Sequence, residues 1–301
     1  MNRLSNADRV RIVSCLVEGM SIRATCRITG FAKGTVLKLL ADLGTVCGDF
    51  HDNAVRNVTA PRLQIDELWS FCYAKERTVR RSDALSKRTD GVGDVWTWTA
   101  LDADSKLMVA WYVGEKDSRS AFTFMQDVAW RLINRPQVTT DGLRFYREAV
   151  ANAFDGNTDF AQLIKIFGDV YPDGRVGTAH AVVVGTETKT ICGNPDPKHV
   201  STSFVERSNL TVRMHNRRFT RLTNAFSKKL HNHRCAIELH FCYYNWCRVH
   251  QTLKMTPAMA AGLADHPWSV AELVGLLDSV EQAAMEGGAL KRGSYKPRNS
   301  N

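Results

Sequence analysis

The sequence lacks the segments that place a protein in or across a membrane. No run of about eighteen apolar residues occurs along the 301-residue chain, so a transmembrane helix is not expected. The first residues, MNRLSNADRV, do not contain the apolar core of a secretory signal peptide. We therefore expect a cytoplasmic protein with no membrane partner.

Closely spaced cysteine pairs are also missing. The eight cysteines include no C-x-x-C pair, which argues against a disulfide framework and against a zinc ribbon, and we expect them to be reduced. One group, His231, His233 and Cys235, with CYYNWC and His250 downstream, has the residue types of a metal site. Structural zinc favours tighter paired spacings, and this aromatic stretch more simply packs as core. No structural zinc is expected, although metal binding by this group stays open.

Positive charge and apolar residues are both abundant. There are 40 Lys and Arg against 31 Asp and Glu, a net charge of +9, and 44% of the residues are hydrophobic. A basic protein of this size most often binds a polyanion, and nucleic acid is the leading candidate. The length predicts one main domain and a smaller one.

Residues 1–44 predict a small domain of three helices. The segment NADRVRIVSCLVEG repeats apolar residues at helical spacing, IRATCRIT ends at Gly30, and AKGTVLKLLADL follows after a short turn. A glycine between the second and third helices indicates a helix-turn-helix. Cys26 is small where two helices must approach closely, and Val36 is apolar where a core contact is needed.

In a helix-turn-helix the third helix enters the major groove of DNA. Its early residues Lys33, Thr35 and Lys38 would face bases or phosphates, and Arg23 and Arg27 would contact the backbone from the second helix. The alternative is a helical bundle for protein contacts, whose basic residues only solvate one face. The turn and the net charge favour DNA.

The region after this unit changes character. Residues 45–61 show no sustained periodicity and end in proline, which predicts a linker. The next segment reads as three strands (RLQIDELWSFCYAKE, then DVWTWTALDADSKLMVAWYVGE with a turn at DADSK), a helix (SRSAFTFMQDVAWRLIN), a strand (QVTTDG), a helix (LRFYREAVANAF) and a strand (FAQLIKIFG).

This order predicts an α/β fold. We expect a ribonuclease H-like mixed five-stranded sheet with flanking helices over residues 62–265, preceded by the small all-α helix-turn-helix domain. Residues 169–200 are a possible insertion, 266–286 a C-terminal helix, and 287–301 a basic disordered tail.

Three acidic residues occur where this fold would bring them together. Asp66 lies in the first strand, Asp141 ends the fourth strand beside it, and Glu206 begins a polar and basic helix. Three carboxylates around two Mg²⁺ or Mn²⁺ ions suit in-line displacement at phosphate. Alternation along the strand sends Glu67 to the face opposite Asp66, so only one of the two is expected to reach the metals.

Each acid also has a purely structural explanation. Asp141 precedes Gly142 and could be a turn residue, Asp66 could be an edge-strand charge, and Glu206 could be a helix N-terminal acid favoured by the dipole. The basic residues Arg213 and Arg217 follow Glu206 at spacings that would place them on its helical face, near phosphates beside the scissile bond.

Taken together, these motifs resemble the transposases of the insertion sequence 1 family, which are DDE transposases. The resemblance rests on IDELWSF, TTDG and FVERSNLTVRMHNRRFTRLTNAFSKK, continues through YYNWCRVHQTLKMTPAMAAGL, and includes SIRATCRITGFAKGTVLKLL. It implies that Asp66, Asp141 and Glu206 form the metal-binding catalytic triad. Two features differ from the family: no cysteine-pair zinc ribbon precedes the helix-turn-helix, and the segment 169–200 is longer than in compact relatives.

The sequence therefore predicts a DNA transposase. It would bind double-stranded DNA at the element ends as a homodimer or higher homo-oligomer, cleave a strand at each end, and join the 3′-hydroxyl to target DNA. One alternative is a ribonuclease H-like nuclease or resolvase, which would not join strands. Another is a DNA-binding regulator with a disused catalytic domain, which Mg²⁺-dependent cleavage would exclude.

Overall fold

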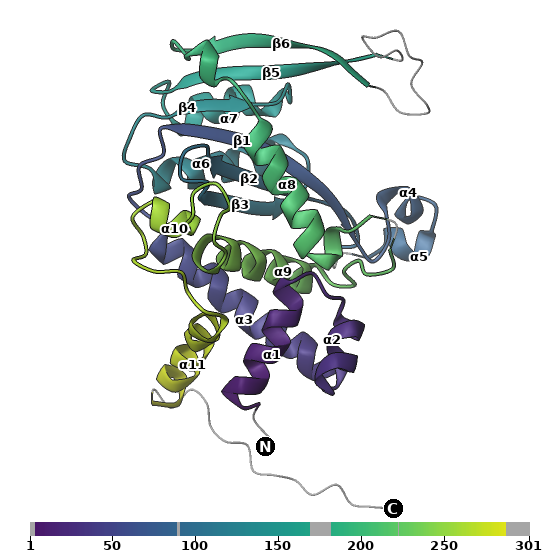
Figure 1. The fold of residues 1–301 in the computed structure, drawn as a ribbon. Helices are drawn as coiled ribbons and strands as arrows, with labels where there is room; N and C mark the ends of the chain where they lie inside the picture. The colour runs from purple at the N-terminus through teal and green to yellow at the C-terminus, as the bar shows by residue number, and fades with distance from the viewer. Residues whose placement is uncertain (1–3, 89–90, 169–181, 222, 287–301) are drawn as a thin grey trace, which may run out of the picture.

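A mixed β-sheet with helices on both faces forms the body of the protein. The computed structural model describes residues 4–88, 91–168, 182–221 and 223–286, which Figure 1 draws as coloured ribbon. The sheet has six strands in the order β3-β2-β1-β4-β5-β6. The expected α/β class is confirmed.

The first five strands follow the expected order. β1 (Arg62–Cys72), β2 (Gly93–Asp102) and β3 (Met108–Gly114) are joined as antiparallel neighbours, whereas β4 (Gln137–Thr140) runs parallel to β1 and β5 (Asp159–Gly168) runs parallel to β4.

The sheet has one strand more than the expected five. β6 (Val182–Cys192) pairs antiparallel with β5, so part of the predicted insertion 169–200 extends the sheet. Its sequence, VVVGTETKTIC, is rich in the β-branched residues that favour strands. Residues 169–181 of that segment lie outside the described residues.

Helices cover the two faces of the sheet. α6 (Ser118–Arg131) and α7 (Phe145–Ala153) lie on one face, where the ring of Trp98 on β2 contacts Phe124 and Tyr146. α8 (Ser203–His215) crosses the other face along β1, as Figure 1 shows. The remaining helical segments are α4 (Glu76–Val79), α5 (Asp83–Ser86), α9 (Leu230–Cys242) with a π-helical turn at Tyr243–Cys247, α10 (Pro257–Ala260), α11 (Val270–Glu286) and the 3₁₀ turns Pro197–His199 and Arg217–Phe219.

Three helices begin the chain: α1 (Asn6–Val17), α2 (Ile22–Thr29) and α3 (Lys33–Ala54). Ser5 and Ser21 cap the first two by accepting a backbone N–H bond. Gly30 ends α2 in the left-handed conformation, at φ 78°, which glycine adopts without strain. Val36 is fully buried, as predicted.

The predicted linker 45–61 is wrong in its first ten residues, because α3 continues to Ala54. Leu43, Cys47 and His51 recur at helical spacing and are all buried. Gly44 and Gly48 are where α9 packs closely, since an added Cβ at Gly44 would collide with the backbone of Cys235. The helix thus joins the N-terminal helices to the sheet, and no domain boundary falls at residue 44.

One hydrophobic core runs through both regions. Its buried residues come from α1, α3, the sheet, α6, α7, α9 and α11. The expected C-terminal helix within 266–286 is present as α11, where Asp278 and Glu281 pair with Arg9 of α1 at 2.9 and 3.0 Å. The predicted tail 287–301 lies outside the described residues. Among the helices described, we find none with the length and apolar character needed to span a membrane.

Candidate active site

The parallel pairing of β1 with β4 brings Asp66 and Asp141 together. The register pairs Ile65 with Thr140, so the next residue after each is an aspartate, Asp66 within β1 and Asp141 directly after β4. β4 ends at Thr140, and the Asp141 carboxylate accepts a 2.9 Å hydrogen bond from the backbone N–H of Leu143 in the turn that follows. The two aspartates are therefore neighbours at one edge of the β1–β4 pair.

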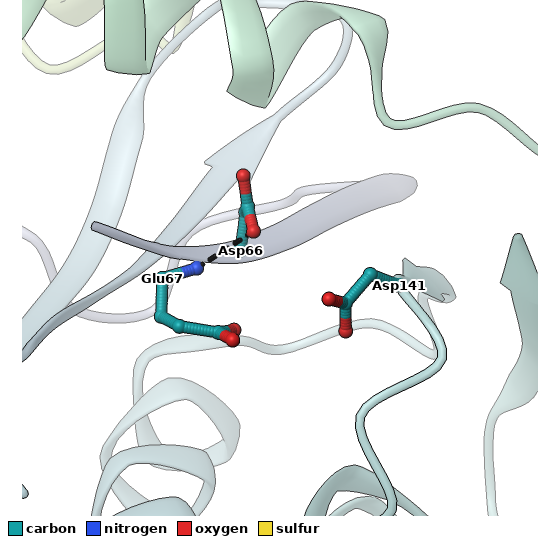
Figure 2. Close-up of side chains that lie close together, drawn as sticks. All are labelled: Asp66, Glu67 and Asp141. Atoms are coloured by element: carbon teal, nitrogen blue, oxygen red, sulfur yellow. Dashed lines mark hydrogen bonds between the residues drawn. The ribbon is translucent and has the colours of Figure 1, made fainter. Parts of the chain in front are cut away.

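Glu67 completes the tightest group of carboxylates. In the described part of the chain, oxygens from Asp66, Glu67 and Asp141 lie within 4.8 Å of one another. Figure 2 shows Asp66 and Glu67 leaving β1 on opposite sides, as alternation predicts, with the Glu67 carboxylate extending toward Asp141. The expectation that Glu67 stays away from the acidic site is wrong, because β4 ends before it could separate Glu67 from Asp141.

Burial and mutual repulsion make this group hard to ionise. Burial raises the pKa of Asp66 to about 7, and the charges of Glu67, Asp141 and Glu206 add to the effect, while a 2.8 Å hydrogen bond from the backbone N–H of Glu67 opposes it. The pKa of Glu67 is also raised, first by burial and then by Asp141. The negative charge of the group thus exceeds what nearby donors offset.

Two side chains outside the acidic group hold Glu67 in place. The phenol of Tyr146 on α7 donates a 3.0 Å hydrogen bond to it, and Lys116 forms an ion pair with it. Tyr146 is fully buried, and the Lys116 ammonium lies 4.4 Å from the centre of the Trp96 ring. Neither residue stands in a motif that could have identified it from the sequence.

Glu206 lies on α8, outside the tight acidic group. Its carboxylate accepts hydrogen bonds from the ammonium of Lys165 on β5, at 2.6 Å, and from the hydroxyl of Thr202, at 2.5 Å. It is still close enough to raise the pKa of Asp66. The structure therefore brings Asp66 and Asp141 together as predicted and places the third predicted acid beside them, paired with a lysine.

The start of α8 is fixed on β1 by Gln64. The side-chain oxygen of Gln64 accepts hydrogen bonds from the backbone N–H groups of Phe204, at 2.8 Å, and Val205, at 3.1 Å. These N–H groups would otherwise lack partners at a helix N-terminus. Because Gln64 stands two residues before Asp66 on β1, this contact sets the position of α8 relative to the acids.

Two further residues of α8 reach toward Asp66. The amide of Asn209 donates a 2.7 Å hydrogen bond to the Asp66 carboxylate. One turn later, the charges of Arg213 and Asp66 interact, although burial and nearby Arg221 lower the pKa of Arg213 overall. Arg213 thus lies near the acids, as expected.

The expected position of Arg217 on this helix is wrong. α8 ends at His215, where Asn216 turns its side-chain amide to the backbone carbonyl of Ala236, at 2.9 Å. Arg217 begins the following 3₁₀ turn and lines a different cleft.

That cleft, of about 980 Å³, lies between the N-terminal helices and the segment that follows α8. It contains Arg23, Lys33 and Lys38, which were predicted to contact DNA, together with Arg217. Lys38 also forms an ion pair with Asp42 on α3. The two other predicted contacts, exposed Arg27 and half-buried Thr35, are not among its lining residues. We call this cavity the basic cleft.

The histidine and cysteine group of α9 does not come together as a ligand set in the described residues. The ring nitrogens of His233 hydrogen-bond to the hydroxyls of Ser227 and Ser70, both at 2.9 Å. His233 is fully buried, and burial lowers its pKa to about 3. His231 contacts Cys235, whose pKa burial raises to about 11, which disfavours the thiolate that metals bind.

The acidic group, in contrast, fits a divalent cation. It offers only carboxylate oxygens, the hard donors that Mg²⁺ and Mn²⁺ prefer, and a cation would relieve the repulsion that raises the pKa of Asp66. Comparison with known proteins identifies no relative: the chain matches no family model and no curated protein.

Proposed function

We propose that this protein is a DNA transposase with a ribonuclease H-like catalytic region. The observation that carries the proposal is the pair Asp66, on β1, and Asp141, directly after the parallel neighbour β4, in a group with excess negative charge. The order β3-β2-β1-β4-β5 supports such a fold, with β6 as an added edge strand. The motifs that resemble insertion sequence 1 transposases give the finer assignment.

Asp66, Asp141 and Glu206 hold two Mg²⁺ or Mn²⁺ ions in this proposal, and Glu67 is close enough to contribute an oxygen. Bound divalent ions would activate the attacking oxygen and stabilise the leaving oxygen at phosphorus. The side chains around the acids prepare them for this role. Asn209 orients the Asp66 carboxylate, and Gln64 sets the position of the helix that carries Glu206.

Lys165 and Arg213 stand beside the acids. Lys165 and Thr202 both bind Oε1 of Glu206, so Oε2 can bind a metal while the Lys165 ammonium stays beside the acids, within reach of a phosphate oxygen. Arg213 is near Asp66 and can contact a phosphate without reading a base. Both residues can therefore hold DNA near the acids.

The N-terminal helices bind the element ends in this proposal. α2 and α3, separated by the left-handed Gly30, act as the helix-turn-helix, with Arg27 and Thr35 as outer contacts. The basic cleft joins Arg23, Lys33 and Lys38 of these helices to Arg217 next to α8. A duplex bound there would run from the N-terminal helices toward the acids, on a protein that acts as a homodimer or higher homo-oligomer.

The test uses purified protein, Mg²⁺, target plasmid and a duplex that carries the inverted repeats flanking the gene. We expect nicks at the repeat ends and joining of their 3′-hydroxyls to the plasmid, both lost in Asp141→Asn. Cleavage without joining would assign the protein to the nucleases or resolvases. DNA binding without any cleavage would support the alternative, a DNA-binding regulator with a disused catalytic domain.

A further inference from the structure

β1 continues beyond the acids into a group of aromatic side chains. Trp69 and Phe71 follow Glu67 at alternate positions and so project from the same face of the strand. The Trp69 and Phe71 rings are 5.7 Å apart, and Phe226 lies 4.7 Å from Phe71. All three are half-buried.

These rings border a cavity of about 560 Å³. Its other walls come from Lys75 and from the segment that follows α8, including Arg221 and Asn224. We call it the aromatic pocket. It thus combines ring faces with cations and amide groups, the side chains that hold the bases and backbone of unpaired nucleic acid.

The aromatic residues of this pocket are not explained by core packing. Trp98 and Trp246 are almost fully buried and belong to the large hydrophobic core. Trp69, Phe71 and Phe226 belong to neither hydrophobic cluster of the described residues. A cluster of partly accessible aromatic rings outside the core is a feature that often marks a ligand-binding surface.

Cations lie over the rings. The Lys75 ammonium is 5.6 Å from the Trp69 ring centre and 5.9 Å from that of Phe71, and Lys228 is 3.8 Å from that of Phe226. Such contacts are worth about 0.5–1 kcal/mol at exposed sites, less than the roughly 1–3 kcal/mol of a base stacked on an aromatic ring. A base can therefore displace the ammonium groups, which are then free to pair with phosphates.

The pocket adjoins the acids. Trp69 is three residues beyond Asp66 on β1, about 10 Å along an extended strand, a length that about three nucleotides span. Arg221 in the pocket wall is near Arg213, which in turn is near Asp66. Trp69 and Phe71 share the face of β1 on which Glu67 lies, so DNA held at the acids would reach the rings along that face.

We propose that the aromatic pocket of Trp69, Phe71 and Phe226 binds unpaired DNA bases a few nucleotides from the phosphate that is cleaved. The inference rests on the proposed function, because it takes DNA as the substrate. It adds that the duplex is locally opened at the acids and that the pocket stabilises the opened strand. Stacking reads no specific base, so the preference is for unpaired structure and not for sequence.

The test compares two fluorescently labelled DNAs that carry the inverted repeat, one fully paired and one with three unpaired nucleotides at its end. Affinities are measured in EDTA by fluorescence anisotropy for the wild type, Trp69→Ala, Phe71→Ala and Trp130→Ala. Trp130, on α6 and 72% exposed, is the matched control. Melting temperatures check folding, and Trp69→Phe keeps a ring in case Trp69→Ala fails to fold.

We expect the wild type to prefer the unpaired DNA by about tenfold, a typical effect of one stacked base. Trp69→Ala and Phe71→Ala should lose this preference while keeping duplex affinity, whereas Trp69→Phe and Trp130→Ala should retain it. No preference in the wild type, or equal behaviour of Trp69→Ala and Trp130→Ala, would overturn the inference. So would loss of self-association in Trp69→Ala with unchanged DNA preference, which would assign the pocket to a second copy of the chain. Failure of the wild type to bind duplex would instead refute the proposed function.

Discussion

Asp66 and Ser70 project from the same face of β1, and each contacts a residue group that the sequence marked as a possible metal site: Asp66 belongs to the half-buried acidic group, and Ser70 binds buried His233. Ser70 and Ser227 bind both nitrogens of His233, which stays neutral with its pKa lowered to about 3. Asp66 faces other carboxylates, and its pKa is raised to about 7. Both ring nitrogens of His233 are hydrogen-bonded within the chain, whereas the carboxylates repel one another and a bound cation could neutralise their negative charge. A cluster whose polar atoms are satisfied within the chain stabilises the fold, whereas one with excess charge is the candidate for ligand binding.

The largest effect is expected from the aspartates. Asp66→Asn and Asp141→Asn keep the side-chain shape and remove ligand charge, so each should reduce DNA cleavage by roughly a thousandfold or more, since metal stabilisation of the transition state amounts to several kcal/mol. Duplex binding should stay largely intact. Gel assays of cleavage and binding measure both, with exposed Glu148→Gln on α7 as the control. Full cleavage by Asp141→Asn would refute the assignment.

Replacing Glu206 and Glu67 should affect DNA cleavage to different extents. Glu206→Gln should also abolish cleavage, because the proposed function assigns Glu206 as the third metal ligand. Glu67→Gln should cost less, roughly tenfold to a hundredfold, because Tyr146 and Lys116 already bind its carboxylate. Single-turnover cleavage rates rank the two variants. If Glu67→Gln lost more of its cleavage rate than Glu206→Gln, Glu67 would be the third metal ligand instead of Glu206.

Removing His233 should affect stability and not chemistry. His233→Ala removes its hydrogen bonds to the Ser70 and Ser227 hydroxyls, which keep only their bonds to Val95 and Arg218, and opens a cavity, so we expect a loss of about 2–4 kcal/mol in the free energy of unfolding. Urea denaturation measures this loss. If added zinc raises the melting temperature of the wild type but not of His233→Ala, this cluster binds metal after all.

The pH dependence of stability gives a smaller effect. Below about pH 6.5 the unfolded chain protonates His233, whereas the folded chain, with a pKa of about 3, does not. The stability that neutral His233 contributes is therefore fully present above pH 6.5 and declines as the pH falls toward 3, by about 2 kcal/mol between pH 6.5 and 5. Urea denaturation across this range should show a shallower decline in His233→Gln. Buried His240, whose pKa is also lowered to about 3, accounts for part of what remains. An identical decline in both proteins would contradict the assignment.

Much of the sheet and the aspartate pair could be predicted because strand order and local polarity specify them. The remaining features depend on lengths and contacts that are not local. Glu67 reaches Asp141 because β4 stops at Thr140, and Arg217 leaves the face of Glu206 because Asn216 ends α8. α3 continues past residue 44, and Gly44 allows α9 to pack closely against it, a contact between distant segments that the local sequence pattern does not reveal.

Titration with Mn²⁺, followed by electron paramagnetic resonance, measures whether Asp66 and Asp141 bind a divalent cation. We expect that the wild type binds Mn²⁺, that Mg²⁺ competes for the site, and that Asp66→Asn and Asp141→Asn lose this binding while His233→Ala keeps it. Equal Mn²⁺ binding by the wild type and Asp66→Asn, or its loss in folded His233→Ala, would refute a metal site at the acidic group.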